Sequence, residues 1–217
     1  MEAKTRRILR ARGTRKTHST GVRLNADAAT AVLAPIYNSI ATTKAAGQHN
    51  LNYGEVEWPT LKYIADTVQR TPGRGKFYDL GCGRGRAVLY MALLGIFEQS
   101  VGIEVLGERI KLAKDAMAQL AKTIGSADSK IRLYEASFTM PTFKFSDARA
   151  VYMSNLCFDD HTQSVIFQKL VREMPKDSLL FCHRVPSPIP AAFSVVAVER
   201  MPMTWTPTSE FHALRHL

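Results

Sequence analysis

The feature that most constrains the fold of this chain is a short apolar run, Phe77 to Leu80, that carries Asp79 and leads directly into a loop with glycine at every second position. A helix-like run from Arg86 to Phe97 follows the loop. A strand, a tight glycine turn and a helix in this order form the cofactor-binding unit of parallel α/β sheets. The sequence therefore predicts a nucleotide-type cofactor site at this turn.

The spacing and charge of the loop indicate which cofactor fits. Its glycines are Gly81, Gly83 and Gly85, whereas the dinucleotide fingerprint places its third glycine where this chain has Arg86. Asp79 would also repel a pyrophosphate that approached the N-terminus of the helix. S-adenosylmethionine (AdoMet) carries no phosphate, and its ammonium and sulfonium groups would attract the carboxylate. We therefore predict that this loop binds AdoMet.

A second acid supports this prediction. The segment Ser100 to Glu104 has the pattern of a second strand that ends in a carboxylate, and carboxylates at this position bind ribose hydroxyls in dinucleotide folds. The third predicted strand leads to Ser137 and Phe138, where Phe138 could cover an adenine face and Ser137 could reach its edge. Phe138 is equally compatible with a place in the core. A glycine-rich turn that binds nothing is the alternative, and the two acids together disfavour it.

Strands and helices alternate along most of the chain, which predicts a mostly parallel sheet with helices on both faces. The last two strand candidates lack a helix-sized connection, so we expect them to pair as an antiparallel hairpin. The predicted fold is therefore α/β: a doubly wound, Rossmann-like sheet of seven strands that looks like the class I AdoMet methyltransferase fold. The predicted strands are 76–80, 100–104, 131–136, 148–155, 179–183, 193–198 and 210–214; the predicted helices are 26–46, capped by Asn25 and broken or kinked at Pro35, then 59–69, 86–97, a helix after Leu106, and 165–174.

The chain of 217 residues is long enough for one domain with an appendage. Residues 1–24 hold eight Lys/Arg and one Glu, a charge of +7 out of a total of +10. We expect this segment to be a basic, disordered arm that binds nucleic-acid phosphates; a solubility tail or a mitochondrial presequence is the alternative. Residues 25–75 are predicted to form N-terminal helices and a loop that covers the cofactor, and 76–217 the catalytic domain. The predicted phosphate contacts are Arg6, Arg7, Arg10, Arg12, Arg15 and Lys16.

Several classes of protein are disfavoured by composition. No uninterrupted apolar run approaches the length of about 18 residues that a membrane-spanning helix needs, and the N-terminus lacks the apolar core of a secretory signal. The three cysteines, at 82, 157 and 182, form no C-x-x-C pair, and the six histidines show no metal-ligand spacing. We expect no membrane span, no metal site and no disulfide framework, and hence a reducing intracellular compartment.

The methyl acceptor should lie at the end of the fourth strand, where Ser154 and Asn155 precede Phe158. Enzymes that methylate amino groups of adenine or glutamine usually carry an Asn/Asp-Pro-Pro-aromatic motif here, and this chain has no proline at that place. Ser154 and Asn155 could hydrogen-bond an incoming amine, and Phe158 could wall its channel. Ser-Asn at a strand end is also a common turn.

A further motif, Tyr53-Gly54-Glu55, lies about 25 residues before the glycine loop. Taken with Asp-Leu-Gly-x-Gly-x-Gly, Gly-Ile-Glu, Ser-Phe and Asn-x-x-Phe, it resembles the disruptor-of-telomeric-silencing family over roughly residues 50–160. Members of this family are lysine methyltransferases without a SET domain that modify a nucleosomal histone. Where the family has an asparagine near the transferring methyl group and an acid beside the adenine, this chain has Ser154 and Ser137.

The resemblance implies a role for each matching residue. Tyr53 would line the lysine channel and, with Glu55, belong to a loop that folds over the cofactor. Trp205 would supply an aromatic wall of the channel, although a place in the core is an alternative for it. Ser154 and Asn155 would orient the amine in a channel formed by Tyr53, Phe158 and Trp205. The predicted AdoMet-binding residues are Tyr53, Glu55, Asp79, Gly81, Gly83, Gly85, Glu104, Ser137 and Phe138.

The sequence thus predicts an AdoMet-dependent lysine N-methyltransferase that acts on the globular core of a nucleosomal histone. As a chromatin regulator it would work in the nucleus, with the basic arm on DNA phosphates. One alternative is a methyltransferase for RNA or a non-histone protein, which would share every cofactor residue. Another is a chromatin-binding module that has lost its activity.

Overall fold

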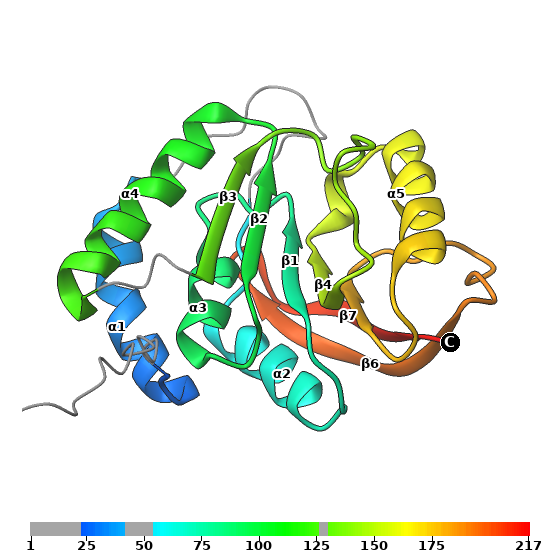
Figure 1. Cartoon of the computed structure of the whole chain (residues 1–217), viewed down its shortest axis with the longest axis horizontal. Helices are drawn as coiled ribbons and strands as arrows, with labels where there is room; N and C mark the ends of the chain where they lie inside the picture. Colours follow the sequence, from blue (N-terminus) through cyan, green and yellow to red (C-terminus); the bar gives the residue numbers. More distant parts are fainter. Residues whose placement is uncertain (1–22, 42–53, 126–129) are drawn as a thin grey trace, which may run out of the picture.

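In the computed structural model, which describes residues 23–41, 54–125 and 130–217, a seven-stranded sheet runs through the centre of the molecule (Figure 1). The strand order is β3-β2-β1-β4-β5-β7-β6. The first five strands are parallel, and β7 runs antiparallel to both β5 and β6. The predicted fold class is therefore confirmed. The strands are β1 (Lys76–Leu80), β2 (Ser100–Glu104), β3 (Ile131–Glu135), β4 (Ala148–Met153), β5 (Leu179–Cys182), β6 (Phe193–Met203) and β7 (Thr206–His216).

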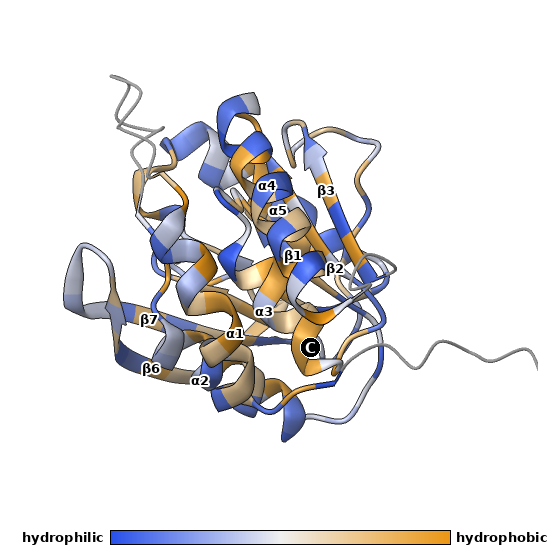
Figure 2. Ribbon diagram, turned by 90° about the vertical axis from the view of Figure 1, so that its left-hand side faces the viewer, coloured by the Kyte–Doolittle hydropathy of each residue, from blue (hydrophilic) through white to orange (hydrophobic). Residues whose placement is uncertain are grey.

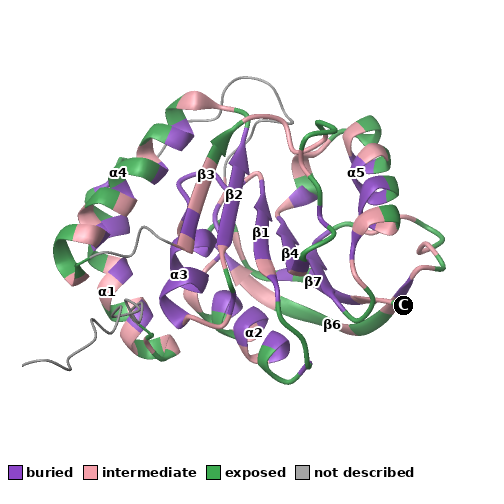
Figure 3. Cartoon of the chain, in the orientation of Figure 1, coloured by how far each residue is buried: buried purple, intermediate pink, exposed green. Residues whose placement is uncertain are grey.

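Helices cover both faces of the sheet, as the alternation of elements predicts. Side chains of α1 to α4 share one core with Phe77 of β1, whereas α5 shares a second core with Tyr78 and Leu80. Successive strand residues thus face opposite layers. Polar and apolar residues alternate along α4 (Figure 2), and the buried residues gather in the central strands and in α3 (Figure 3). The helices are α1 (Ala26–Ser39), α2 (Trp58–Gln69), α3 (Arg86–Leu94), α4 (Gly107–Ile124) and α5 (Asp160–Glu173).

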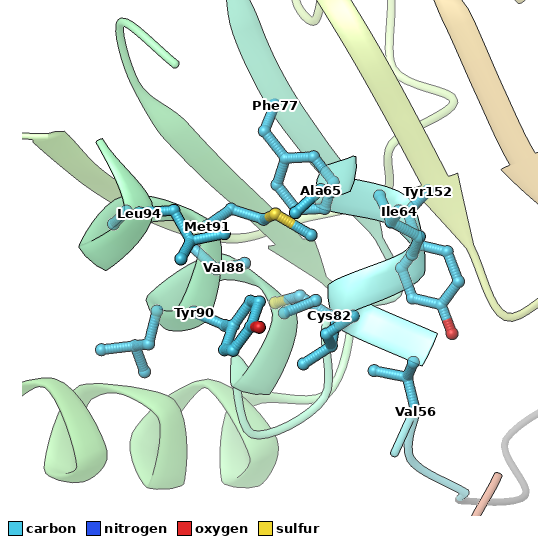
Figure 4. Packing of buried hydrophobic residues seen from close by; sticks show 14 of the residues in the cluster. Val56, Ile64, Ala65, Phe77, Cys82, Val88, Tyr90, Met91, Leu94 and Tyr152 are labelled. Atoms are coloured by element: carbon cyan, nitrogen blue, oxygen red, sulfur yellow. The ribbon is translucent and has the colours of Figure 1, made fainter. Parts of the chain in front are cut away.

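Helix α3, which follows the glycine loop, is buried on every side. All its residues after Arg86 are buried, because α1 and α2 cover the side that does not face the sheet. A helix that is apolar all round has to be enclosed in this way. The glycine loop is consequently anchored to a helix whose residues belong to a large buried cluster (Figure 4).

The first helix departs from its predicted limits. The Asn25 side chain accepts a hydrogen bond from the Ala28 N–H at 2.8 Å, so the predicted cap is present. Pro35 lies within α1 and does not interrupt it, and the helix ends at Ser39. Residues 42–46 of the predicted helix lie outside the described residues. Leu24, which was assigned to the arm, donates its N–H to the carbonyl of Leu93 and packs on the core.

The C-terminal hairpin is longer than predicted. Strands β6 and β7 have 11 residues each, because the pairing continues through polar positions of β6 such as Glu199 and Arg200 that interrupt the apolar pattern. Such residues are tolerated because β6 is the edge of the sheet, where side chains face solvent. The hairpin turns at Thr204 and Trp205.

Two glycines let β2 and α4 approach the cofactor loop closely. A Cβ atom on Gly102 would lie 2.7 Å from Cys82 Sγ. Gly85 caps α3 with a φ of 78° in the left-handed region, where a side chain is strained, and a Cβ there would lie 3.2 Å from the Cβ of Ala113. No helix among the described residues is long and apolar enough to cross a membrane.

Candidate active site

A cavity opens where β1, β2 and β4 end, at the carboxyl edge of the sheet where ligands bind in such folds. Its walls come from the segment before α2, the glycine loop, the ends of these strands and the β6–β7 turn. The lining residues are Gly54, Glu55, Val56, Asp79, Gly81, Cys82, Gly83, Arg86, Ala87, Glu104, Val105, Arg109, Phe138, Tyr152, Ser154, Leu156, Cys157, Phe158 and Trp205.

Asp79 is the acid at the end of β1, and only 3% of its surface is exposed. Burial, and then the negative charges of Glu104 and Glu55, raise the pKa of this carboxyl well above its usual range. The ionised form is therefore costly in the free protein. A cation in the cavity would offset that cost, so the site favours a positively charged guest.

Glu104, at the end of β2, is fixed in place by the backbone around it. Its Oε2 accepts the Gly83 N–H at 3.0 Å and its Oε1 accepts the Leu106 N–H at 3.0 Å. Arg109 Nη1 lies 4.0 Å from Oε2. Since each carboxylate oxygen can accept two hydrogen bonds, Glu104 retains capacity for the hydroxyls of a diol.

Two aromatic rings form one wall. Phe138 and Phe158 stack with centroids 5.3 Å apart and planes inclined by 28°, and both line the cavity. Ser137 does not line it: its Oγ lies 2.7 Å from the Thr139 hydroxyl and accepts the Thr139 N–H at 3.3 Å. The predicted contact of Ser137 with the adenine edge is thus not supported by its position, because its hydroxyl shapes the turn after β3.

A buried ion pair that the sequence analysis missed supports the glycine loop. Arg84 donates two hydrogen bonds to the Glu55 carboxylate, from Nε to Oε1 at 2.9 Å and from Nη2 to Oε2 at 2.5 Å. Arg86 Nη2 lies 2.5 Å from the same Oε2. Arg84 is 2% and Glu55 7% exposed, and bidentate pairing of this kind is strong and directional. The available signal was the Gly-Arg-Gly-Arg run, two cations in a loop that needs an acid nearby.

The same arginines reach the N-terminal helices. Arg84 Nη1 donates to the carbonyls of Ile40 at 3.0 Å and Ala41 at 3.2 Å, just after α1. The Tyr37 hydroxyl donates back to the Arg84 carbonyl at 3.0 Å. The guanidinium of Arg86 lies 4.9 Å from the centre of the Trp58 ring. These contacts tie α1, α2 and residue 55 to the loop that lines the cavity.

Of the predicted acceptor residues, Ser154 and Phe158 line the cavity and Asn155 does not. Asn155 is fully buried. Its amide nitrogen donates to Gln163 at 2.9 Å and to the Arg184 carbonyl at 2.8 Å, and its oxygen accepts the N–H groups of His183 and Arg184. All four hydrogen-bonding positions of the amide are used, so Asn155 joins β4 to β5 and has none left to orient an amine. Its predicted catalytic role is corrected accordingly.

Trp205 lies at the β6–β7 turn with 40% of its surface exposed, and it lines the cavity. The structure thus places it in the wall and not in the core. A Cβ on Gly54 would lie 2.2 Å from its Cε3 atom, so the ring fits only against glycine. The two segments are also joined by backbone contacts: the Thr204 N–H donates to the Glu55 carbonyl at 2.9 Å, and the Glu55 N–H to the Thr204 hydroxyl at 2.8 Å.

His183 stands behind Trp205, with ring centres 5.5 Å apart. Its Nδ1 lies 2.9 Å from the Glu210 carbonyl, which can only accept, so Nδ1 carries the proton. Burial lowers the pKa of this imidazole. A neutral ring at this place adds no positive charge behind the Trp205 wall of the cavity.

Other predicted residues lie outside the described residues, and their roles stay predictions. They are Tyr53 and the basic residues Arg6, Arg7, Arg10, Arg12, Arg15 and Lys16. Within residues 23–41, 54–125 and 130–217, no group of three His, Cys, Asp or Glu side chains could hold a metal ion.

The strand order, the acid before the glycine loop and the second acid at the end of β2 define a class I AdoMet-dependent methyltransferase. The family model described as "Histone methylation protein DOT1" matches residues 37–179, which is 143 of the 217 residues. The chain belongs to this family, which confirms the resemblance found in its motifs. It is therefore an AdoMet-dependent methyltransferase of a histone-methylating family.

Solved structures share the fold at low sequence identity. HI0767 from Haemophilus influenzae, provisionally assigned as a methylase, has a TM-score of 0.56 at 9% identity over 73% of this chain and 88% of that one. SMU.1697c from Streptococcus mutans, provisionally assigned as a methyltransferase and solved with SAH, has 0.54 at 9% over 72% and 97%. An RNA methyltransferase from Salinibacter ruber, in complex with S-adenosyl-L-homocysteine, has 0.51 at 18% over 71% and 88%. Comparison with curated proteins gives no match.

The residues of the cavity fit AdoMet. Asp79 is a buried carboxyl whose raised pKa makes its ionised form costly, and a cation beside it would offset that cost. Glu104 has acceptor capacity left for ribose hydroxyls. Phe138 and Phe158 supply flat apolar surface for a base. Arg86 lines the same cavity, and its Nε has no hydrogen-bond partner among the described residues.

Asp79→Asn should weaken AdoMet binding by about 10- to 100-fold, since a charge-assisted contact is lost, and should leave the free protein at least as stable. The folded-state pKa of Asp79 is raised, so its contribution to stability is fully present below its unfolded pKa of about 4 and declines as pH rises through the folded value. The stability advantage of the variant should thus grow with pH. Calorimetric titration and urea unfolding at several pH values measure both effects.

Asp147→Asn is the matched control, because this carboxyl lies away from the cavity. Burial opposes its ionisation, but hydrogen bonds from Lys76 and Tyr78 lower its pKa overall. Its stabilising contribution is present above the unfolded pKa and lost as pH falls. The control should therefore lose stability near neutral pH and keep its AdoMet affinity. The same pH trend in both variants would refute the assignment of Asp79.

Glu55→Gln should destabilise the protein by about 3–5 kcal/mol, because the buried Arg84 would lose its bidentate counter-charge and Arg86 would keep only Glu57, 3.6 Å away. AdoMet affinity should also fall, since the glycine loop loses its support. Urea unfolding and calorimetry test this, with Asp66→Asn as the control. Asp66 pairs with Lys62, which is exposed, and loss of this ion pair should leave stability unchanged. Equal stability of Glu55→Gln and the wild type would show that the pair does not hold the loop.

Proposed function

We propose that this protein transfers the methyl group of AdoMet to a lysine amine in the globular core of a nucleosomal histone. The observation that carries the proposal is the shape of one cavity, in which the acid that favours the cationic cofactor, Asp79, is continuous with an acceptor wall of Ser154, Phe158 and Trp205. Membership of the histone-methylating family supports a protein lysine as the acceptor.

The reaction requires little acid–base catalysis from the protein. AdoMet supplies a methyl group on a sulfonium, which is already a good leaving group. The residues around it have to hold a neutral amine in line with the methyl carbon and keep water out. Only about 0.05% of a free lysine is neutral at pH 7. The apolar wall of Phe158, Leu156 and Trp205 disfavours the ammonium form and raises that fraction.

A nucleosome would also offer DNA phosphates to the basic arm, residues 1–24, as a second point of contact. The basic arm holds most of the net charge of the chain, and phosphate contacts provide affinity that does not depend on base sequence. We propose that Arg6, Arg7, Arg10, Arg12, Arg15 and Lys16 bind nucleosomal DNA and that the protein acts in the nucleus as a chromatin regulator.

RNA or a non-histone protein is the second candidate acceptor, and the similarity to an RNA methyltransferase concerns the fold alone. Isotopically labelled AdoMet should be offered with nucleosomes, free histones and RNA side by side. We expect label on a histone within nucleosomes and little or none on free histones or RNA, and less label at limiting AdoMet with Asp79→Asn, the control with weakened cofactor binding. Label on RNA alone would refute the proposal.

Removal of residues 1–22 should weaken nucleosome binding and flatten its dependence on salt. If all six named cations contact phosphates, the slope of log K against log salt should fall by roughly 5. A variant with the arm arginines replaced by lysine keeps the charge and should retain the slope. Equal affinity of the truncated and intact proteins at low salt would contradict a role of the arm in DNA binding.

A further inference from the structure

Apolar side chains are exposed around the mouth of the cavity. Val105, Leu156 and Trp205 all line it, and all belong to the exposed large apolar residues of the described chain. Val105 directly follows β2 and lies at the cofactor end, whereas Leu156, which is 38% exposed, and Trp205 line the acceptor end with Ser154. Single exposed apolar residues are normal on a protein surface, but a group around one opening marks a binding surface. We call Leu156 and Trp205 the mouth pair.

The backbone that carries the mouth pair is fixed by hydrogen bonds. Asn155, which precedes Leu156, joins this turn to α5 and to the segment after β5 through its side-chain amide. Thr204, which precedes Trp205, exchanges two hydrogen bonds with Glu55. Both turns are therefore formed before a partner binds. A partner that covers the mouth pair consequently gains the burial of apolar surface at little cost in ordering the protein.

The charged residues beside the mouth are acids. Within the described part of the chain, the exposed or partly exposed charged residues that directly flank cavity-lining residues are Glu57, Glu108 and Asp159. Arg184 approaches the same edge, but it pairs with Asp160 and donates to a backbone carbonyl. Carboxylates repel phosphate groups and attract cations. The surroundings of the mouth thus disfavour a nucleic-acid backbone and favour a polypeptide that carries a lysine.

We propose that the mouth pair binds an apolar side chain next to the acceptor lysine, so that the enzyme selects a polypeptide in which the target lysine has an apolar neighbour. This inference rests on the proposed lysine methyltransferase function. The lysine enters the cavity between Ser154 and Phe158, and the neighbouring side chain covers Leu156 and Trp205. A base of RNA could stack on Trp205, but RNA offers Leu156 no aliphatic partner and would bring phosphates toward the acids.

Leu156→Ser tests the contact, and Val198→Ser is its matched control. Val198 is 51% exposed on β6 and does not line the cavity. Each variant should keep its fold and its AdoMet affinity, measured by calorimetry. KM and kcat are then measured with nucleosomes at low and at high salt. Phosphate contacts weaken as salt rises, whereas an apolar contact does not.

We expect Leu156→Ser to raise KM for nucleosomes by roughly ten-fold at both salt concentrations. The change in kcat should be smaller, because Phe158 and Trp205 still enclose the amine. Leu156→Met keeps an apolar side chain and should retain the KM of the wild type, as should Val198→Ser. An unchanged KM in an active Leu156→Ser enzyme, or a rise that disappears at high salt, would overturn this inference and leave the proposed function intact.

Leu156→Lys separates the two classes of acceptor. A cation at the mouth should reduce methyl transfer to nucleosomes, because it removes the apolar contact and repels the acceptor lysine. If the mouth received RNA, the same cation would strengthen binding and increase the label on RNA, which would refute both the inference and the proposed function. A wild type that binds AdoMet but labels no histone would overturn the proposed function and this inference with it.

Discussion

The buried pair between Arg84 and Glu55 is the interaction on which the geometry of the site depends. Arg84 belongs to the glycine loop and Glu55 to a segment that precedes α2, and the same guanidinium also reaches the carbonyls that follow α1. Ions buried this deeply are stable only when each keeps its counter-charge. The N-terminal helices are thus fixed to the cofactor loop by charge as well as by packing.

The cofactor half of the site could be predicted from the sequence because topology places it. Parallel strands bring their carboxyl ends to one edge, so Asp79 and Glu104 had to meet there. The acceptor half followed less well. Asn155 and Ser137 are polar residues at strand ends, as predicted. Their side chains, however, form hydrogen bonds with neighbouring residues and not with a ligand-facing position: Asn155 bonds to Gln163, and Ser137 accepts the Thr139 N–H. A pattern of residue types does not distinguish a side chain that faces the cavity from one that bonds to the backbone.

The sequence analysis missed other residues for a different reason. Tyr152 lies within the predicted fourth strand, and only the structure shows that it lines the cavity. Arg84 pairs with an acid 29 positions away; the Gly-Arg-Gly-Arg run indicates that an acid is needed, but the spacing does not show which one. The longer hairpin escaped prediction because edge strands accept polar residues that break the alternation on which strand prediction depends.

The contacts between residues 54–56 and the turn at Thr204 and Trp205 join chain segments 149 positions apart. The β6–β7 hairpin therefore has two tasks, since it forms the edge of the sheet and also supplies Trp205 to the wall of the cavity. Cofactor binding and acceptor binding can then be lost separately: local opening of this hairpin would remove Trp205 while Asp79 and Glu104 stayed in place. Conversely, an acceptor that binds against Trp205 stabilises the edge of the sheet, so substrate binding and the folding of this hairpin are thermodynamically linked.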